Sequence, residues 1–305
     1  NMIYDVAIVG AGPAGLTASI YASRYGMKNI VFGEAGGLTT KAHEIGNWLG
    51  TEKIKGFEFA AKAEQHARSY GAPIENTLVG KIEKKDENFI LNYNGKEAEA
   101  RTILLAMGSN HRHLEIPGEK EFSGKGVSYC ATCDGFFYKD KVVAVIGGGN
   151  SAAQAAISLS ELARKTFLIH RGAAFTAEEY WIDAIARNSK IESVLNTNVI
   201  RIKGSSKLEE IILDKLHENS DKLQIDGLFI EIGFNPNVEN VKALGIAFDP
   251  SNFIIVDTYG RTNIAGIWAA GDITTGSGKF KQIVTASAEG AIAVHNIHQY
   301  LKSKF

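Results

Sequence analysis

The residues best suited to chemistry in this 305-residue chain are two cysteines, Cys130 and Cys133, which Asp134 follows directly. They are the only cysteines of the chain, and they stand in a C-x-x-C arrangement. A dithiol of this spacing can close to a disulfide and open again with two electrons. Its potential depends on how far the surroundings stabilise the thiolate. The pair therefore predicts a redox centre, with a carboxyl group beside it.

Three other interpretations of the cysteine pair stay open. A structural zinc site ordinarily needs four ligands, and the chain has no second C-x-x-C. His111 and His113 lie upstream, but not at a familiar zinc spacing, so we expect no metal. A disulfide staple across so short a loop would contribute only about 2 kcal/mol in the chain-entropy model. Chance spacing of two buried thiols is the third alternative.

The amino-acid composition limits the kinds of partner and the cellular compartment that we expect for this protein. Basic residues number 33 and acidic residues 34, which gives a formal net charge of −1. This balance argues against nucleic acid, or an anionic membrane, recognised by bulk charge. No apolar run approaches the roughly eighteen residues of a membrane span, so we expect no membrane partner. Two cysteines in a single motif do not form a secreted disulfide framework, and we expect a cytoplasmic protein.

A dinucleotide-binding pattern opens the chain. The apolar run Tyr4–Val9 predicts a buried parallel strand, and the glycine-rich stretch Gly10–Gly15 (GAGPAG) follows at once. Leu16–Tyr25 has helical spacing, Asn29–Phe32 predicts a second strand, and Glu34 comes shortly after it. In this context the glycines permit a tight turn, and the helix N-terminus faces a pyrophosphate. The carboxylate then reaches a ribose hydroxyl.

The same order of elements recurs after the cysteines. Lys141–Ile146 predicts a strand and Gly147–Ala152 (GGGNSA) the glycine turn. Ala153–Ala163 predicts the helix, and Thr166–Ile169 the next strand. Two such units in one chain indicate an internal duplication of architecture. A last helix is predicted over Lys281–Leu301.

The two glycine patterns, the C-A-T-C-D between them and the late Gly271-Asp272 resemble the low-molecular-weight thioredoxin reductases over essentially the whole chain. These enzymes belong to the FAD-dependent pyridine nucleotide-disulfide oxidoreductase family. The resemblance implies an α/β fold with two Rossmann-like (three-layer ββα) dinucleotide-binding domains, the second inserted into the first. Residues 1–112 and 240–305 would form the FAD-binding domain, and residues 113–239 the inserted NAD(P)-type domain that carries the dithiol.

The resemblance also implies the electron path and the residues around FAD. Electrons would pass from the flavin to Cys133 and on to Cys130, which attacks the partner's disulfide, while Asp134 handles protons. The candidate FAD residues are Gly10, Gly12, Pro13, Ala14, Gly15, Glu34, Gly37, Leu38, Thr39, Asn47, Ala106, Gly108, Gly271, Asp272, Lys281, Gln282 and Ile283. The loop Gly46–Gly50 (GNWLG) lacks the acid and the proline of the family's E-N-W-P-G.

The second glycine pattern should bind the hydride donor, and there the chain departs from the family. NADPH-using members carry H-R-R and a further arginine that clamp the 2′-phosphate. This chain has His170-Arg171-Gly172 and then Phe175-Thr176, and no acid stands at the strand end for NAD. The candidate nucleotide residues are Gly147, Gly149, Asn150, Ser151, Ala152, His170 and Arg171. Two alternatives stay open: a scaffold for the dithiol, or weak and NADH-tolerant binding of NAD(P)H.

The sequence thus predicts an FAD-dependent thioredoxin-disulfide reductase. Electrons would leave through the Cys130–Cys133 dithiol to thioredoxin or a similar small redox protein. One alternative keeps this chemistry but replaces NAD(P)H with ferredoxin or another external carrier. A second is a flavoprotein that senses redox state without turnover. A third is an oxidoreductase of the ferredoxin–NADP reductase kind, without dithiol chemistry. The resemblance also implies a homodimer.

Overall fold

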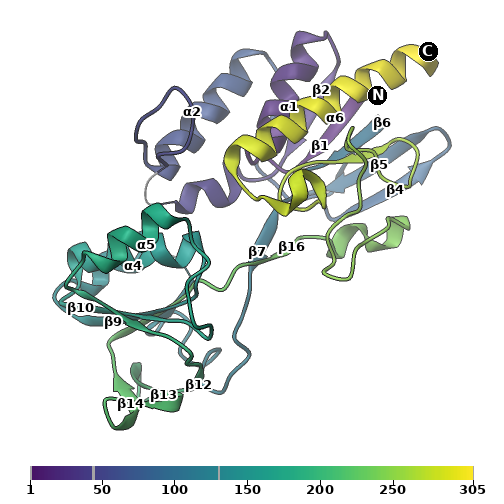
Figure 1. Ribbon diagram of the computed structural model, residues 1–305. Coiled ribbons are helices and arrows are strands. Elements are labelled where there is room, and N and C mark those ends of the chain that lie inside the picture. The colour runs from purple at the N-terminus through teal and green to yellow at the C-terminus, as the bar shows by residue number, and fades with distance from the viewer. Residues whose placement is uncertain (1, 43–44, 130, 305) are drawn as a thin grey trace. The chain divides into compact units, whose positions relative to one another are not determined.

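A computed structural model describes residues 2–42, 45–129 and 131–304, except for the side chains of Lys41, Thr132, Cys133, Phe234 and Lys279. The chain divides into two compact units (Figure 1). The first unit comprises residues 1–110 and 235–305, and the second unit residues 111–234. The sequence placed the joins slightly later, at 112/113 and 239/240. Within the described ranges, no helix is long and apolar enough to cross a membrane.

A seven-stranded sheet forms the centre of the first unit. Its order is β3-β2-β1-β6-β5-β4, and β17 pairs with β6. The pairs among β1, β2, β3, β6 and β17 are parallel, whereas β4 and β5 continue from β6 as an antiparallel meander. The strands are β1 (Ile3–Val9), β2 (Asn29–Phe32), β3 (Ile74–Glu75), β4 (Lys81–Lys85), β5 (Asn88–Tyr93), β6 (Lys96–Leu105) and β17 (Ile267–Ala269).

Both faces of this sheet are buried, which explains the uninterrupted apolar run of β1. Val6 and Ile8 belong to a core that also contains residues of α1 (Pro13–Arg24) and α6 (Ile283–Lys304). Ala7 and Val9 point to the opposite face, because side chains alternate along a strand. They belong to a second core. A further helix, α2 (Gly56–Ser69), packs against α1.

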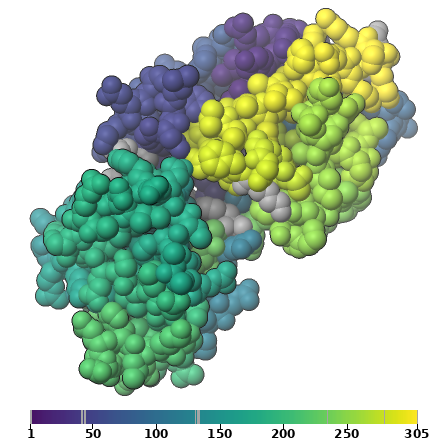
Figure 2. Space-filling model, in the orientation of Figure 1, coloured from purple at the N-terminus to yellow at the C-terminus, as the bar shows by residue number. Residues whose placement is uncertain are grey.

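Segments from the two ends of the chain lie side by side in the first unit. In the space-filling view the yellow C-terminal residues lie directly against the purple N-terminal residues (Figure 2). Small residues permit this close packing, since a Cβ on Gly290 of α6 would lie 2.1 Å from the carbonyl oxygen of Ala14. α6 begins at Ile283, later than predicted, because Gln282 N–H is bonded to the Thr285 hydroxyl (3.1 Å) and caps the helix.

The second unit contains two sheets. A parallel sheet has the order β11-β10-β9-β15-β8, and an antiparallel sheet the order β12-β13-β14. The strands are β8 (Val127–Ser128), β9 (Val142–Ile146), β10 (Lys165–Ile169), β11 (Ile191–Val194), β12 (Val199–Gly204), β13 (Leu208–His217), β14 (Ser220–Gln224) and β15 (Gly227–Ile230). The helices are α3 (Ala131–Asp134), η2 (Gly135–Tyr138), α4 (Asn150–Leu162) and α5 (Glu179–Ala186).

Two cores hold the second unit in three layers. Ala144 of β9 packs with Ile211 of β13 in the core between the two sheets. Val143 and Val145, on the other face of β9, pack with Leu159 of α4. The layers are therefore antiparallel sheet, parallel sheet and helices (Figure 1). The predicted fold class is confirmed: the α/β chain has two Rossmann-like units, the second inserted into the first.

The two connections between the units pair with each other. β7 (Ser109–His111) and β16 (Phe234–Pro236) form a separate two-stranded sheet. On the side of the first unit, Asn237 donates its backbone N–H to the carbonyl oxygen of Gly108 (3.0 Å). Its side-chain amide donates to the carbonyl oxygen of Met107 (2.9 Å). The outgoing and returning strands are thus joined by hydrogen bonds.

Candidate functional site

The first glycine turn brings β1, β6 and α1 so close together that only glycine fits. Gly10 has a φ of +118°, and a Cβ there would lie 2.0 Å from the carbonyl oxygen of Ala106. A Cβ on Gly15 would lie 1.8 Å from the carbonyl oxygen of Gly10. Gly12, in contrast, has open space beside it. The turn therefore presents bare backbone at the N-terminus of α1.

The N-terminus of α1 has no side-chain cap. Pro13 begins the helix and carries no N–H. Gly12, at the N-cap position, makes no side-chain hydrogen bond to the backbone of the first turn. Backbone N–H groups of the first turn are therefore available, and the helix dipole adds partial positive charge. Together with the open space at Gly12, these features fit the pyrophosphate of a dinucleotide such as FAD.

The loop after β2 lies against this turn. The N–H of Gly36 donates to the carbonyl oxygen of Ala11 (2.7 Å), and a Cβ on Gly33 would lie 3.0 Å from the Ala11 nitrogen. Glu34 is exposed between these two glycines. Its carboxylate therefore stands in solvent beside the turn, where a ribose hydroxyl would be bound. The next three candidates, Gly37, Leu38 and Thr39, belong to the short helix η1 (Gly37–Lys41).

The turn after β17 also reaches α1. Gly271 has a φ of +81°, and a Cβ there would lie 3.0 Å from the Cβ of Ala14. Burial raises the pKa of the neighbouring Asp272, Glu289 raises it further, and Lys281 opposes both effects. A carboxyl group whose charge is disfavoured in this way is suited to hydrogen-bond a polyhydroxyl chain.

Glu289 of α6 holds the loop that carries Asp272. Its carboxylate accepts hydrogen bonds from the N–H of Gly271 (2.8 Å) and from the hydroxyls of Thr274 (2.9 Å) and Ser277 (2.6 Å). The sequence analysis did not identify this residue. The only available signal was an acid on a helical stretch otherwise rich in small residues, ASAEGA.

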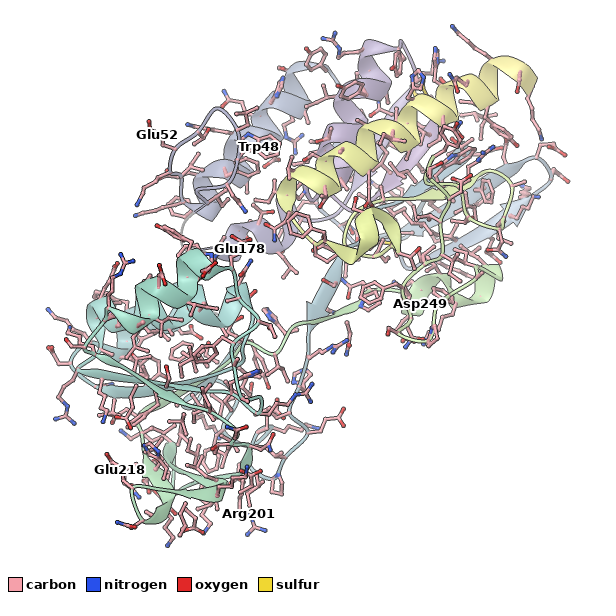
Figure 3. The ribbon with its side chains drawn as sticks, in the orientation of Figure 1. Trp48, Glu52, Glu178, Arg201, Glu218 and Asp249 are labelled. Carbon is pink, nitrogen blue, oxygen red and sulfur yellow. The ribbon has the colours of Figure 1, made fainter. Side chains whose placement is uncertain are left out.

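Asn47 and Gln282 meet although they lie far apart in the sequence. The amide nitrogen of Asn47 donates to Gln282 Oε1 (2.9 Å). Trp48 packs edge to face on Phe59 of α2, with ring centroids 5.3 Å apart (Figure 3). The loop Gly46–Gly50 therefore reaches the segment before α6 without the family's acid and proline.

All the candidate FAD residues lie in the first unit. The Gly10–Gly15 turn is in contact with Ala106, with the loop Gly33–Gly37 and with Gly271. Gly108, at the start of the outgoing connection, has a φ of +63° and open space beside it. The remaining candidates lead into α6: Lys281, Gln282 and Ile283. The residues present fit FAD, and the role of each remains a prediction.

The segment around the cysteines runs from β8 into two short helices. Cys130 and the side chain of Cys133 lie outside the described residues; the Cys133 backbone belongs to α3. The hydroxyl of Ser128, which is buried, donates to Asp134 Oδ2 (2.5 Å). This bond ties the acid after the cysteine pair to the strand before it.

Two aromatic side chains are exposed directly after Asp134. Phe136 and Phe137 of η2 are 75% and 68% exposed. The next residue, Tyr138, instead packs edge to face on Phe229, with ring centroids 5.2 Å apart. Burial and the neighbouring Asp134 raise the pKa of Tyr138, which keeps its phenol neutral. Adjacent exposed aromatic rings form an apolar surface of the kind that binds partners.

The segment after β10 packs against Gly148 of the second glycine turn. A Cβ on Gly148 would lie 2.3 Å from the ring of His170, and one on Gly172 would lie 2.7 Å from its Nε2. The imidazole therefore lies between these two glycines, next to Phe175, with ring centroids 5.8 Å apart. Burial and the adjacent Arg171 lower the pKa of His170, so its ring is neutral near pH 7.

The segment after β10 also bonds to the start of α4. Thr176 donates both its N–H (2.7 Å) and its hydroxyl (3.2 Å) to the carbonyl oxygen of Gly148. Asn150, the first residue of α4, donates its amide to Glu178 Oε1 (2.9 Å) and accepts the N–H of Glu178 (2.7 Å). Figure 3 labels this glutamate. An exposed carboxylate is thus bonded to the first residue of α4, and of the candidate nucleotide residues only Arg171 carries a fixed positive charge.

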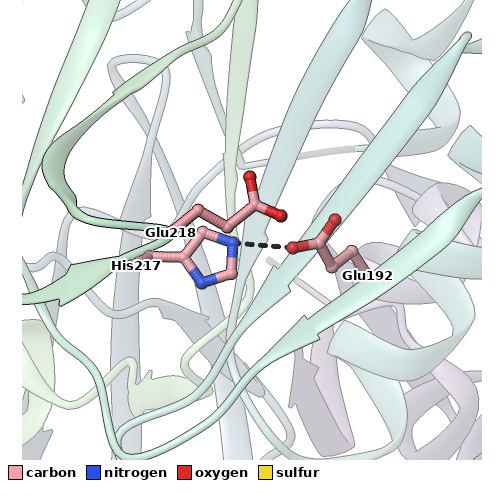
Figure 4. A group of neighbouring side chains, drawn as sticks. All are labelled: Glu192, His217 and Glu218. Carbon is pink, nitrogen blue, oxygen red and sulfur yellow. Dashed lines mark hydrogen bonds and ion pairs between the residues drawn. The ribbon is translucent and has the colours of Figure 1, made fainter.

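A separate cluster in the second unit combines three groups able to bind metal ions. Potential ligand atoms of Glu192, His217 and Glu218 lie within 4.8 Å of one another (Figure 4). Glu192, however, already accepts bonds from Lys165 (2.5 Å) and from His217 (2.6 Å). Burial opposes ionisation of Glu192, but these two bonds outweigh it and lower the pKa of the carboxyl group. The cluster is therefore an ion-pair network that joins β11 to the hairpin β13–β14.

Two Rossmann-like units, one inserted into the other and the inserted one carrying the only two cysteines, define a two-domain dinucleotide-binding oxidoreductase. A family model described as pyridine nucleotide-disulphide oxidoreductase matches residues 4–290. Thioredoxin reductase of Helicobacter pylori is 38% identical over 309 residues, which cover 98% of this chain and 99% of that protein.

Solved structures agree with this assignment. Lactococcus lactis thioredoxin reductase (FR conformation) superposes with a TM-score of 0.94 at 34% identity, over 98% of this chain and 99% of that chain. The ferredoxin-flavin thioredoxin reductase of Clostridium acetobutylicum gives a TM-score of 0.54 at 34% identity, over 99% of each chain. The chain belongs to the pyridine nucleotide-disulphide oxidoreductase family, in the group of FAD-dependent low-molecular-weight thioredoxin reductases. The predicted family and enzyme class are therefore confirmed.

Proposed function

We propose that the chain is an FAD-dependent disulfide reductase that takes electrons from a protein carrier such as a ferredoxin. Through the Cys130–Cys133 dithiol it passes them to the disulfide of thioredoxin or of a similar small protein. The observation that carries the choice of donor is the packing of the segment from His170 to Glu178 against Gly148 and Asn150 of the second glycine turn. The similar ferredoxin-flavin thioredoxin reductase supports the same choice.

The charge at the second glycine turn disfavours NADPH. A 2′-phosphate needs several cationic donors, and arginine forks are best suited to it. Arg171 is the only such group among the candidate residues, because His170 is neutral and Gly172 and Thr176 carry no charge. The carboxylate of Glu178, which is bonded to the first residue of α4, adds negative charge there and disfavours a pyrophosphate. We infer that this unit serves as the scaffold of the dithiol.

The residues of the first unit would bind FAD through the first glycine turn. Its pyrophosphate would lie at the open N-terminus of α1, its ribose near Glu34, and its ribityl hydroxyls near Asp272. When bound, FAD supplies an electron relay between the external carrier and the dithiol. The bond between Asn47 and Gln282 ties two further candidate contacts to each other.

The dithiol step follows from thiol–disulfide exchange. The thiolate of Cys130 attacks one sulfur of the partner's disulfide, which forms a mixed disulfide and releases one partner thiolate. The thiolate of Cys133 then attacks the Cys130 sulfur, which closes the Cys130–Cys133 disulfide and releases the second. Each released thiolate takes up a proton, and Asp134, held by Ser128, is placed to carry one of them.

An exposed surface for the partner lies beside this motif. Phe136 and Phe137 are only two and three residues beyond Asp134 in sequence, and both rings are largely exposed. Aromatic side chains contribute much of the binding energy of protein interfaces. We infer that the small protein substrate docks on these rings before exchange begins. A homodimer and a cytoplasmic location remain predictions of the sequence.

Anaerobic mixing of the oxidised holoenzyme with each donor tests this function. We expect NADPH and NADH to leave the flavin absorbance unchanged over seconds, and reduced ferredoxin to bleach it. Added oxidised thioredoxin should then be reduced, and Cys130→Ser should abolish that reduction. Rapid bleaching by NADPH would overturn the proposed donor. A wild-type protein that bleaches but reduces no thioredoxin would favour a redox sensor instead.

A further inference from the structure

Glu119 is a buried acid of the second unit that the proposed chemistry does not use. Only 4% of the residue is exposed, and it accepts hydrogen bonds from Tyr129 and from two backbone N–H groups. Its Oε1 accepts the hydroxyl of Tyr129 (2.6 Å) and the N–H of Leu114 (3.1 Å), and His113 Nδ1 lies 3.2 Å away. Its Oε2 accepts the N–H of Glu115 (2.6 Å). Both carboxylate oxygens are thus committed to partners of this chain.

The charge of this acid is stabilised by those partners. Burial opposes ionisation of Glu119, but the bonds from Tyr129, from two backbone N–H groups and from His113 outweigh it and lower the pKa of the carboxyl group. Burial and the carboxylate together raise the pKa of Tyr129, so its phenol stays a neutral donor. The pair is therefore an ionised acceptor and a neutral hydroxyl, a charge-assisted hydrogen bond.

One end of this network holds a strained turn. Glu115 has a φ of +58°, in the left-handed region that non-glycine residues rarely adopt. The bond from its N–H to the carboxylate of Glu119 stabilises that backbone. Glu115 and its neighbour Leu114 belong to the segment that follows the outgoing connection β7. The acid therefore holds the backbone of Leu114 and Glu115, near the start of the second unit.

The other end of the network leads to the dithiol. Tyr129 is joined by a peptide bond to Cys130, and it follows directly after Ser128, whose hydroxyl holds Asp134. The ring of Tyr129 also packs edge to face on His113, with ring centroids 4.9 Å apart. The last described residue before the cysteine pair is therefore anchored through its side chain, and a buried charge provides that anchor.

We propose that Glu119 is a positioning residue for the dithiol, acting through Tyr129 on the placement of the Cys130 thiol. This inference rests on the proposed function, because it assumes that the Cys130–Cys133 pair exchanges with a partner disulfide. Glu119 holds Tyr129, the residue directly before the first cysteine, and loosening that hold should change the reactivity of the Cys130 thiol.

Tyr129→Phe is the decisive variant, because it removes only the hydroxyl and leaves the buried acid with its backbone donors. Glu119→Gln is the stronger variant, because an amide turns one acceptor oxygen into a donor facing backbone N–H groups. Glu121→Gln is the matched control, an exposed acid two residues further along. Each holoenzyme is reduced with dithionite and mixed with increasing oxidised thioredoxin, and its unfolding temperature is measured.

We expect Tyr129→Phe to lower the saturating rate of thioredoxin reduction at least tenfold, with the half-saturating concentration unchanged within twofold. The docking rings Phe136 and Phe137 are untouched, so only the exchange step should respond. Alkylation of the reduced dithiol by iodoacetamide should change at least threefold in the same variant. Glu121→Gln should match the wild type in both assays.

Wild-type rates of exchange and of alkylation in folded Tyr129→Phe protein would overturn the inference, whatever happens to its unfolding temperature. If Glu119→Gln does not fold, Tyr129→Phe alone decides. A wild type that reduces no thioredoxin would refute the proposed function. The alkylation comparison would still test whether Glu119 positions the thiols, since it needs no partner protein.

Discussion

Replacing Glu289 with alanine should weaken FAD binding about a hundredfold. Three groups of the loop Gly271–Ser277 donate to this carboxylate at 2.6–2.9 Å. Hydrogen bonds to charged groups contribute about 1.5–3 kcal/mol, but water can reach a half-buried site, so we take about 1 kcal/mol for each. The loop presents Gly271 to α1 and carries Asp272. Without the carboxylate, FAD binding must supply the roughly 3 kcal/mol that orders this loop. That free energy corresponds to roughly a hundredfold increase in the dissociation constant for FAD.

The measurement is a titration of apoprotein with FAD, followed by flavin fluorescence. Glu289→Gln should give an intermediate affinity, because the amide keeps one acceptor oxygen and the shape of the side chain. Glu58→Ala, which removes an exposed acid from α2 of the same unit, should bind FAD within twofold of the wild type. If Glu289→Ala protein is folded and also binds FAD within threefold of the wild type, the loop does not depend on this carboxylate and the reasoning is refuted.

Three further outcomes follow from contacts in the second unit. Thr176→Arg adds an exposed cation beside the second glycine turn and should give measurable flavin reduction by NADPH in stopped flow, where the wild type gives none over seconds; no reduction in the variant would show that charge is not limiting there. Ser128→Ala removes the hydroxyl bonded to Asp134 and should slow thioredoxin reduction about tenfold, without changing flavin reduction by the carrier; equal rates would contradict the role of this bond. Glu192→Gln should lower the free energy of unfolding by about 1 kcal/mol at pH 7. Because the folded pKa of this carboxyl lies below its unfolded value, the difference should disappear as pH falls from about 4.5 through the folded pKa; denaturant titrations with a constant difference down to pH 2.5 would refute it.

The main elements could be predicted because their signals are local. An apolar run such as that of β1, a glycine turn and helical spacing stand next to one another in the sequence, and each follows from backbone sterics or burial. The end of such a run is less well determined. The last helix was predicted from Lys281, whereas it begins at Ile283, because a hydrogen bond from the N–H of Gln282 to the Thr285 hydroxyl decides the start.

The candidate sites show the same division between local and distant signals. The glycines of the first turn were predicted together with Glu34. In the structure, the loop that carries Glu34 lies against that turn. The bond from Glu289 to the Gly271 loop was not predictable, since it joins two elements through a side chain that belongs to no motif. The same holds for Asn47, whose partner Gln282 lies far along the chain.

The sequence by itself determined that this protein carries a C-x-x-C dithiol between two glycine turns, because those patterns depend on residue type and spacing alone. It also showed that arginines are missing at Gly172 and Thr176. Only the tertiary structure decided that Glu178 is bonded to the start of α4, because its hydrogen bonds with Asn150 form only when the segment after β10 folds back on α4. Tyr129, which precedes the dithiol in the sequence, is likewise bonded to Glu119 through a contact that only folding creates.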